Sequence, residues 1–74
     1  MDAPKNIIGP TIRRLRSKAG LSQAELAARC QRQGWDIARD TVAKIEGQRR
    51  WIGDSEIVQL AKALRVEIQD LFAR

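Results

Sequence analysis

Apolar residues recur at intervals of three and four along most of the chain, which is the spacing of one face of an α-helix. The first series consists of Ile8, Ile12, Leu15 and Ala19. Pro10 suits the first turn of a helix, and Gly20 suits the position just after a helix end. The pattern predicts a helix from about Gly9 to Gly20, preceded by a flexible arm over residues 1–7.

Two short helices are predicted next. Ser22 and Glu25 have the spacing of a capping box, so a second helix begins there and ends at Gly34. Its inner stripe consists of Leu26, Ala27 and Cys30, and we expect Cys30 to be a buried apolar residue rather than a reactive thiol. A third helix is predicted from about Arg39 to Glu46. It places Val42 and Ile45 on one face and polar side chains on the other.

Two more helices complete the prediction. Asp54 is expected to cap a fourth helix, whose apolar stripe consists of Ile57, Leu60, Ala61 and Leu64. A last short helix carries Ile68, Leu71 and Phe72. No segment alternates at period two, so the prediction is an all-α fold, a compact bundle of five short helices.

The charge of the chain is unevenly distributed. Residues 1–50 contain eleven Lys/Arg and five Asp/Glu, a net charge of +6, whereas residues 51–74 have a net charge of −1. The positive field therefore coincides with the second and third helices, which favours a polyanionic partner such as double-stranded DNA. No apolar run approaches the ~18 residues of a membrane span. The basic residues are spread over several helices and lack a companion apolar face, so no membrane partner is expected either.

Residue types argue against catalysis. The chain has no histidine and a single cysteine, so neither a Ser/His/Asp arrangement nor an ordinary zinc site is possible. We expect no enzyme activity, no metal and no cofactor. The single cysteine and the absence of a signal-peptide pattern favour a cytoplasmic protein, which DNA binding would associate with the nucleoid.

Three segments resemble the Cro/repressor-type, or Xre-like, helix-turn-helix family. They read IGPTIRRLRSKAGLSQAELA, TVAKIE and DSEIVQLAKALRVEIQDLF, and together they span nearly all of the chain. The resemblance implies a lambda-repressor-like five-helix domain over residues 8–74, in which the second and third helices form the helix-turn-helix. It also implies a sequence-specific transcriptional regulator that inserts the third helix into the major groove of an operator, as a homodimer.

The resemblance also assigns functional roles to individual residues, by matching their positions to those of the family motif. The base-contacting places match Arg39, Asp40 and Lys44, and the resemblance implies a backbone phosphate at Gln23. A structural ion pair is implied between Arg16 and Glu46. From the residues themselves, Thr41 is a further candidate for a base contact, and the neighbouring loop adds the candidate phosphate contacts Arg49 and Arg50. For Asp40, a role at the helix N-terminus or in orienting Arg39 remains an alternative to accepting from a cytosine.

The sequence departs from the family pattern around the third helix. About five extra residues lie near Gln31–Asp36, so either the second helix is longer or the turn is wider. Ala38 stands where a capping Ser or Thr is common, and Asp36 is the alternative cap. Gly47 precedes the usual glycine place, which Gln48 occupies, so a different loop path is expected.

Two tryptophans leave alternatives open. Trp35 is expected to cover the second helix, and Trp51 to wedge under the basic loop or to meet a second subunit. An antitoxin-like or adaptor module with the same fold, which binds a protein partner, remains the alternative function. A nucleic-acid binder without sequence preference is a further one.

Overall fold

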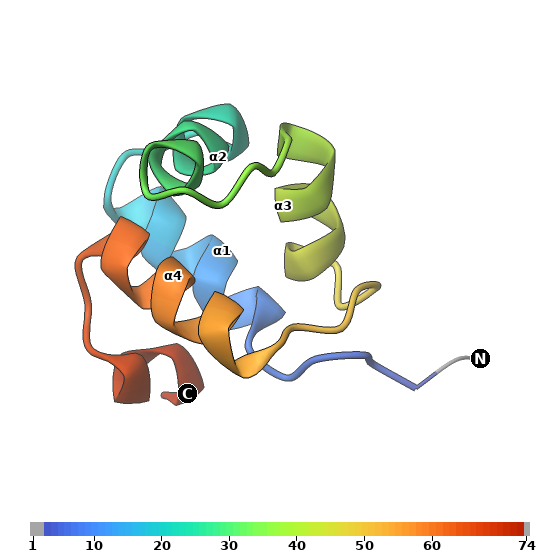
Figure 1. Ribbon diagram of the computed structural model, residues 1–74. Helices are drawn as coiled ribbons and strands as arrows, with labels where there is room; N and C mark the ends of the chain where they lie inside the picture. The colour runs from blue at the N-terminus through green and yellow to red at the C-terminus, as the bar shows by residue number, and fades with distance from the viewer. Residues whose placement is uncertain (1–2, 74) are drawn as a thin grey trace.

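The computed structural model describes residues 3–73, which form four α-helices and one 3-10 helix (Figure 1). The α-helices are α1 (Gly9–Lys18), α2 (Gln23–Arg32), α3 (Arg39–Glu46) and α4 (Asp54–Leu64), and the 3-10 helix is η1 (Ile68–Phe72). No strand occurs in this part of the chain, so the all-α prediction is confirmed.

The prediction of a fifth α-helix is wrong, because the last segment is the 3-10 helix η1. The backbone N–H of Asp70 donates to the carbonyl of Glu67 at 3.0 Å, three residues back, which is the 3-10 pattern. The Asp70 carboxylate accepts from the Glu67 N–H at 2.9 Å and closes the first turn. The segment η1 is five residues long, and such short lengths are typical of 3-10 helices.

The predicted capping box at the start of α2 is confirmed. The Ser22 hydroxyl accepts from the Glu25 N–H at 3.0 Å, and the Glu25 carboxylate accepts from the Ser22 N–H at 2.9 Å. The second of these bonds holds the pKa of Glu25 below its usual value, since it favours the ionised form. Gly20 follows the end of α1 and Gly34 follows the end of α2. Their φ angles of 75° and 97° lie in a backbone region that favours glycine.

Two predicted caps are wrong. Asp54 is the first residue of α4, and the Gly53 N–H before it donates to the Glu56 carboxylate at 3.0 Å. Glu56 thus reaches back over the first turn to the residue before the helix, while the Asp54 carboxylate accepts from the adjacent Ser55 N–H at 2.7 Å. Ala38 precedes α3 without a side-chain cap, so Asp36 does not shift the helix start.

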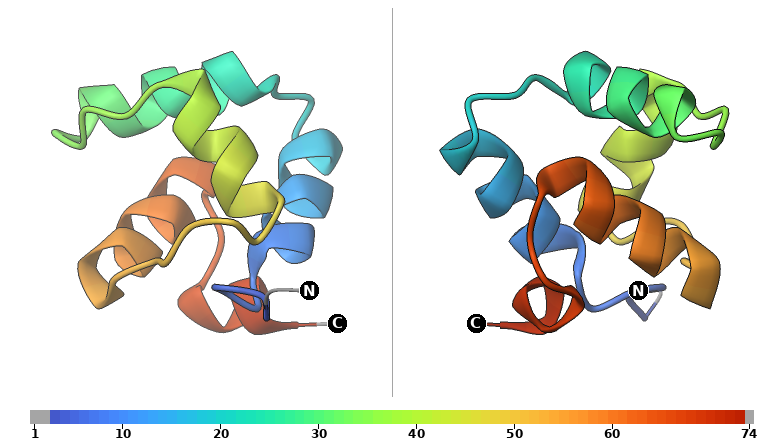
Figure 2. Two further views of the ribbon diagram at one scale, coloured as in Figure 1. Left: turned by 90° about the vertical axis from the view of Figure 1, so that its right-hand side faces the viewer. Right: turned by 60° about the vertical axis from the view of Figure 1, so that its left-hand side comes forward.

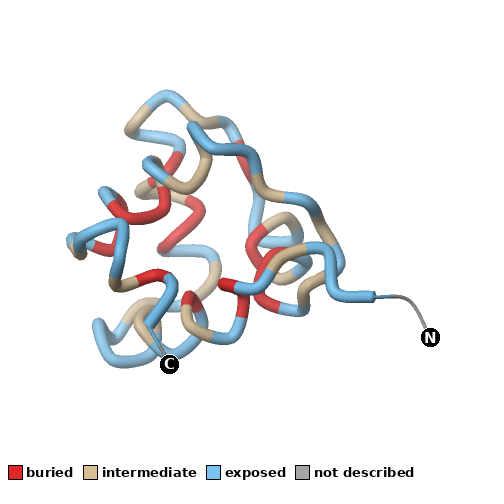
Figure 3. The backbone as a smooth tube through the Cα atoms, turned by 90° about the horizontal axis from the view of Figure 1, so that it is seen from below, coloured by how far each residue is buried: buried red, intermediate tan, exposed pale blue. Residues whose placement is uncertain are grey.

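The core collects the apolar stripes of all five elements. Along each helix, buried stretches alternate with exposed ones (Figure 3). The largest fully buried side chains are Ile12, Leu26, Ile45, Leu60, Leu71, Val42 and Cys30. Burial raises the pKa of the Cys30 thiol to about 11, which keeps it protonated and unreactive at neutral pH. Of the three apolar residues predicted for the last helix, Leu71 is fully buried in the core, while Ile68 and Phe72 are each 46% exposed.

Helix α2 ends at Arg32, so the first of the extra residues near Gln31–Asp36 lie in that helix and the rest form a wide turn to α3. The Trp35 N–H donates to the Cys30 carbonyl at 2.9 Å, and the Gln31 side-chain amide donates to the Ile37 carbonyl at 2.6 Å. Ile37 is buried, and Trp35 packs partly buried against the core. The extra residues thus close over α2 and still deliver the chain to the start of α3.

Candidate nucleic-acid interface

Helix α3 packs through one face and exposes the other. Val42 and Ile45 are buried, whereas Arg39, Asp40 and Lys44 are exposed. Thr41 is half-buried beside them. Figure 2, left, looks onto α3, which lies at the front of the molecule with α2 crossing behind its upper end. Three of the four predicted base-contacting side chains therefore share one open face of one helix.

A buried carboxylate ties α3 to the helices behind it. The Glu46 carboxylate accepts from Arg16 Nε at 2.6 Å and from a second Arg16 nitrogen at 3.1 Å. The Gln23 side-chain amide donates to the same carboxylate at 3.0 Å. Arg16 also donates to the Leu21 carbonyl at 2.8 Å, across the turn between α1 and α2. One carboxylate thus fixes α1, α2 and the C-terminal end of α3 relative to one another.

This arrangement extends to the start of α3. The Gln23 side-chain oxygen accepts from Arg39 at 3.2 Å, so the two candidate DNA-contacting residues touch each other. Hydrogen bonding to Glu46 raises the pKa of Arg16, because it favours the charged guanidinium. The Arg16 and Glu46 side chains are only 13% and 4% exposed. A pair so far removed from water needs both partners, because either charge alone would be costly.

Asp40 lies next to Arg39 and contacts it weakly. The oxygen–nitrogen distance between them is 3.4 Å, and the side chains are 80% and 60% exposed. Solvent screens such a pair, so it contributes little to stability. Asp40 also lies in the first turn of α3, where its negative charge interacts favourably with the positive end of the helix dipole.

The two arginines after α3 differ in their surroundings. Arg50 donates to both oxygens of Glu56, at 2.9 and 3.1 Å, and its guanidinium lies 5.9 Å from the centre of the Trp35 ring. Hydrogen bonding to Arg50 holds the pKa of Glu56 below its usual value. Arg49 is exposed and forms no ion pair among the described residues. Arg50 therefore anchors the loop, while Arg49 is available to a ligand.

Trp51 is 71% exposed, so the prediction that it wedges under the basic loop is wrong. The place beside Arg50 is taken by the ring of Trp35, which arrives from the wide turn. The alternative, that Trp51 meets a second subunit, stays a prediction.

Sequence reasoning missed Asn6. Its side-chain amide donates to the Ile45 carbonyl at 3.1 Å and to the Arg50 carbonyl at 2.9 Å. Its side-chain oxygen accepts from the Gly9 N–H at 2.8 Å, at the start of α1. Asn6 joins the N-terminal segment, α1 and the end of α3. The only signal for it was an asparagine three residues before a helix start, which is a weak capping pattern.

Gln48 adopts the left-handed conformation that glycine favours, with φ of 60°. Its backbone carbonyl accepts from the Lys5 N–H at 3.0 Å, and its side-chain amide donates to the Asn6 carbonyl at 2.9 Å. These bonds offset the cost of an unusual backbone, and they hold residues 5 and 6 against the loop. The expected flexibility of the arm stays a prediction, and its first two residues lie outside the described part.

Other kinds of site find little support. Residues 3–73 contain no group of three or more Cys, Asp or Glu placed to hold a metal ion. None of the helices in the described part of the chain has the length and apolar character to cross a membrane.

Comparison with known proteins gives a matching family and several similar solved structures. A helix-turn-helix family model matches residues 12–71. The restriction-modification controller protein C.AhdI from Aeromonas hydrophila is 34% identical, with a TM-score of 0.78 over 88% of this chain and 87% of that one. A hypothetical transcription factor, NHTF from Neisseria, is 30% identical, with a TM-score of 0.80 over 96% of this chain and 76% of that one. No curated protein matches the chain.

Proposed function

The chain belongs to the Cro/repressor-type helix-turn-helix family of DNA-binding transcriptional regulators, and we propose that it reads a specific operator through α3 in the major groove. The observation that carries this proposal is the open polar face of α3. That face is set at a fixed angle by the buried contacts of Glu46 with α1 and α2. A recognition helix needs both properties, because base edges are read only by side chains held in register.

Each candidate base-contacting residue of α3 has a chemically defined role in this proposal. Arg39 gives two parallel hydrogen bonds to O6 and N7 of a guanine, a contact worth about 1–3 kcal/mol of discrimination. Lys44, at the other end of the helix, contacts a base or a phosphate. Thr41 meets a thymine methyl group, and Asp40 accepts from a cytosine or orients Arg39.

Phosphate contacts fix the register. A phosphate near Gln23 meets the N–H groups and the favourable dipole at the start of α2. Arg49 supplies a second contact. Arg50, the third candidate, has to leave Glu56 to reach a phosphate, so we assign it the weakest contribution.

We propose that the protein acts as a homodimer. Ile68 and Phe72 are half-exposed apolar side chains on η1, and they offer a surface for a second copy. A two-fold dimer places two recognition helices about 34 Å apart, so the operator is nearly palindromic with half-sites roughly 10 base pairs apart.

Selection of bound duplexes from a random library, followed by titration of the winner against a scrambled duplex, tests this function. We expect a near-palindromic winner, bound ~10³-fold or more above the scrambled duplex at fixed salt. If about six phosphates are neutralised, log affinity falls with log salt at a slope of about −5. Arg39→Ala should cost about 1–3 kcal/mol and relax the preference at one base pair, whereas Arg32→Ala, in the exposed last turn of α2, should leave both unchanged.

Other outcomes identify the alternatives. Equal affinity for every duplex would refute the reading of a specific operator and would indicate a DNA-packaging role. Absence of DNA binding would refute the proposal and favour the antitoxin-like or adaptor module, in which the same fold binds a protein.

A further inference from the structure

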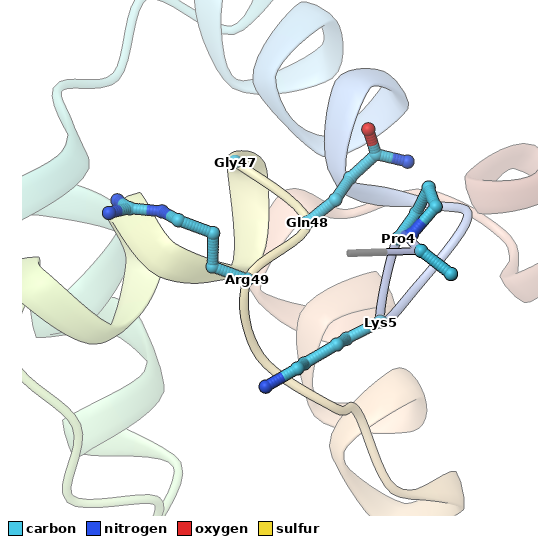
Figure 4. A pocket seen from close by; sticks show the side chains of 6 residues that line it. Pro4, Lys5, Gly47, Gln48 and Arg49 are labelled. Atoms are coloured by element: carbon cyan, nitrogen blue, oxygen red, sulfur yellow. The ribbon is translucent and has the colours of Figure 1, made fainter. Parts of the chain in front are cut away.

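A pocket opens where the N-terminal segment lies beside the loop after α3. It has a volume of about 470 Å³ and is lined by Ala3, Pro4, Lys5, Gly47, Gln48 and Arg49. Figure 4 shows the segment and the loop on its two sides. The pocket borders the C-terminal end of the helix to which we assign base reading, so a ligand held by α3 passes close to it.

The N-terminal segment is held in place on this side. The Lys5 N–H donates to the Gln48 carbonyl at 3.0 Å, and Asn6 bridges to the Ile45 and Arg50 carbonyls. The Gln48 side chain returns a bond to the Asn6 carbonyl. Four hydrogen bonds therefore join residues 5 and 6 to the end of α3 and its loop, and Lys5 starts from a fixed backbone position.

The pocket carries positive charge without internal compensation. Lys5 and Arg49 are both exposed, and neither forms an ion pair within residues 3–73. Their side chains leave the pocket rim in different directions (Figure 4). Two cations that diverge from one rim suit successive phosphates of one strand better than a single shared anion.

We infer that the segment Ala3–Asn6 is part of the DNA-binding surface, that Lys5 contacts a backbone phosphate next to the one held by Arg49, and that Asn6 is the positioning residue for this contact. The inference rests on the proposed function, since it names a further part of the same surface. Residues 5 and 6 are held by hydrogen bonds before DNA arrives, so little conformational entropy is lost when Lys5 binds the phosphate.

The salt dependence of operator binding by the full chain measures the Lys5 contact. Removing one phosphate contact lowers the slope of log affinity against log salt by about 0.9. For Lys5→Gln, the affinity deficit relative to wild type should therefore shrink about 3.5-fold between 50 and 200 mM salt. Lys62→Gln is the matched control, because Lys62 is an exposed lysine in the last turn of α4, on a different pocket. Its slope should equal that of wild type.

Asn6→Ala tests the positioning role. Its slope should fall nearly as far as that of Lys5→Gln, and the double variant should show no further decrease. A purely structural role would lower the melting temperature without changing the slope. If Asn6→Ala does not fold, Gln48→Ala removes the bond to the Asn6 carbonyl and should reduce the slope in the same direction.

The outcomes separate the two proposals. If wild type binds its operator and Lys5→Gln has an unchanged slope, the Lys5 contact is refuted and the proposed function stands. A lowered slope for Lys5→Gln with an unchanged slope for Asn6→Ala and Gln48→Ala refutes the positioning role. If wild type binds no DNA, both proposals fail together.

Discussion

Arg16→Met is expected to destabilise the domain severely, because it leaves the Glu46 carboxylate buried without its charged partner. The carboxylate is 4% exposed and accepts three hydrogen bonds, two of them from Arg16. After the substitution only the neutral Gln23 amide still donates to it. Methionine keeps the apolar stem of arginine, so the change removes the charge and the donors more than the packing.

Breaking one side of a buried ion pair costs about 3–5 kcal/mol. A 74-residue domain at 0.05–0.15 kcal/mol per residue has a total stability of roughly 4–11 kcal/mol. The substitution therefore removes a large part of the total. At about 4–8 °C per kcal/mol for a domain of this size, a loss of 3 kcal/mol lowers the melting temperature by roughly 12–24 °C.

Urea denaturation of wild type, Arg16→Met, Glu46→Leu and the double variant, followed by circular dichroism, gives the coupling energy of the pair. We expect the double variant to recover most of the loss, since replacing both charges with apolar groups removes the uncompensated charge. The cycle also covers the case in which Arg16→Met alone fails to fold.

A cost below about 1 kcal/mol for Arg16→Met would refute the reasoning, because it is the value of a solvated pair. A double variant as unstable as the worse single variant would also contradict it. In that case packing at the junction, not the unpaired charge, would account for the loss.

Two further predictions concern the backbone and pH. Gly9→Ala should cost about 1–3 kcal/mol, because its methyl group would meet carbonyl oxygens at the end of α3, one of them at 2.8 Å. Gly53→Ala, whose methyl group would find no neighbour closer than 3.9 Å, should cost less in the same thermal melt, and equal losses would contradict the close approach. The lowered pKa of Glu56 means that its pair with Arg50 stabilises the fold above the usual carboxyl range, near pH 4.3, and that this contribution disappears as pH falls through the folded-state pKa. The stability difference between wild type and Glu56→Gln should thus be about 1 kcal/mol at pH 7 and should shrink as the pH is lowered into the acid range. A difference independent of pH would exclude this origin.

Local features of the fold were predictable from the sequence. Apolar spacing and glycine positions located the four α-helices, because an amphipathic stripe has to face the core wherever the chain runs. The capping box at Ser22 was predictable for a similar reason, since both of its hydrogen bonds lie within four residues. The last helix was mistaken for an α-helix, because a five-residue segment carries too little periodicity to separate the two helix types.

Which residues face one another was decided by the tertiary structure. Asn6 meets the Ile45 carbonyl 39 residues away, and the ring of Trp35, which precedes α3 in the chain, lies under Arg50, which follows α3. Such contacts depend on how the helices cross, and local spacing contains no information about crossing angles. The sequence by itself therefore determined a basic, all-helical chain with one polar helix face. Only the folded chain showed that Arg50 is an anchor, that Trp51 is exposed, and that the N-terminal segment lies beside the loop after α3.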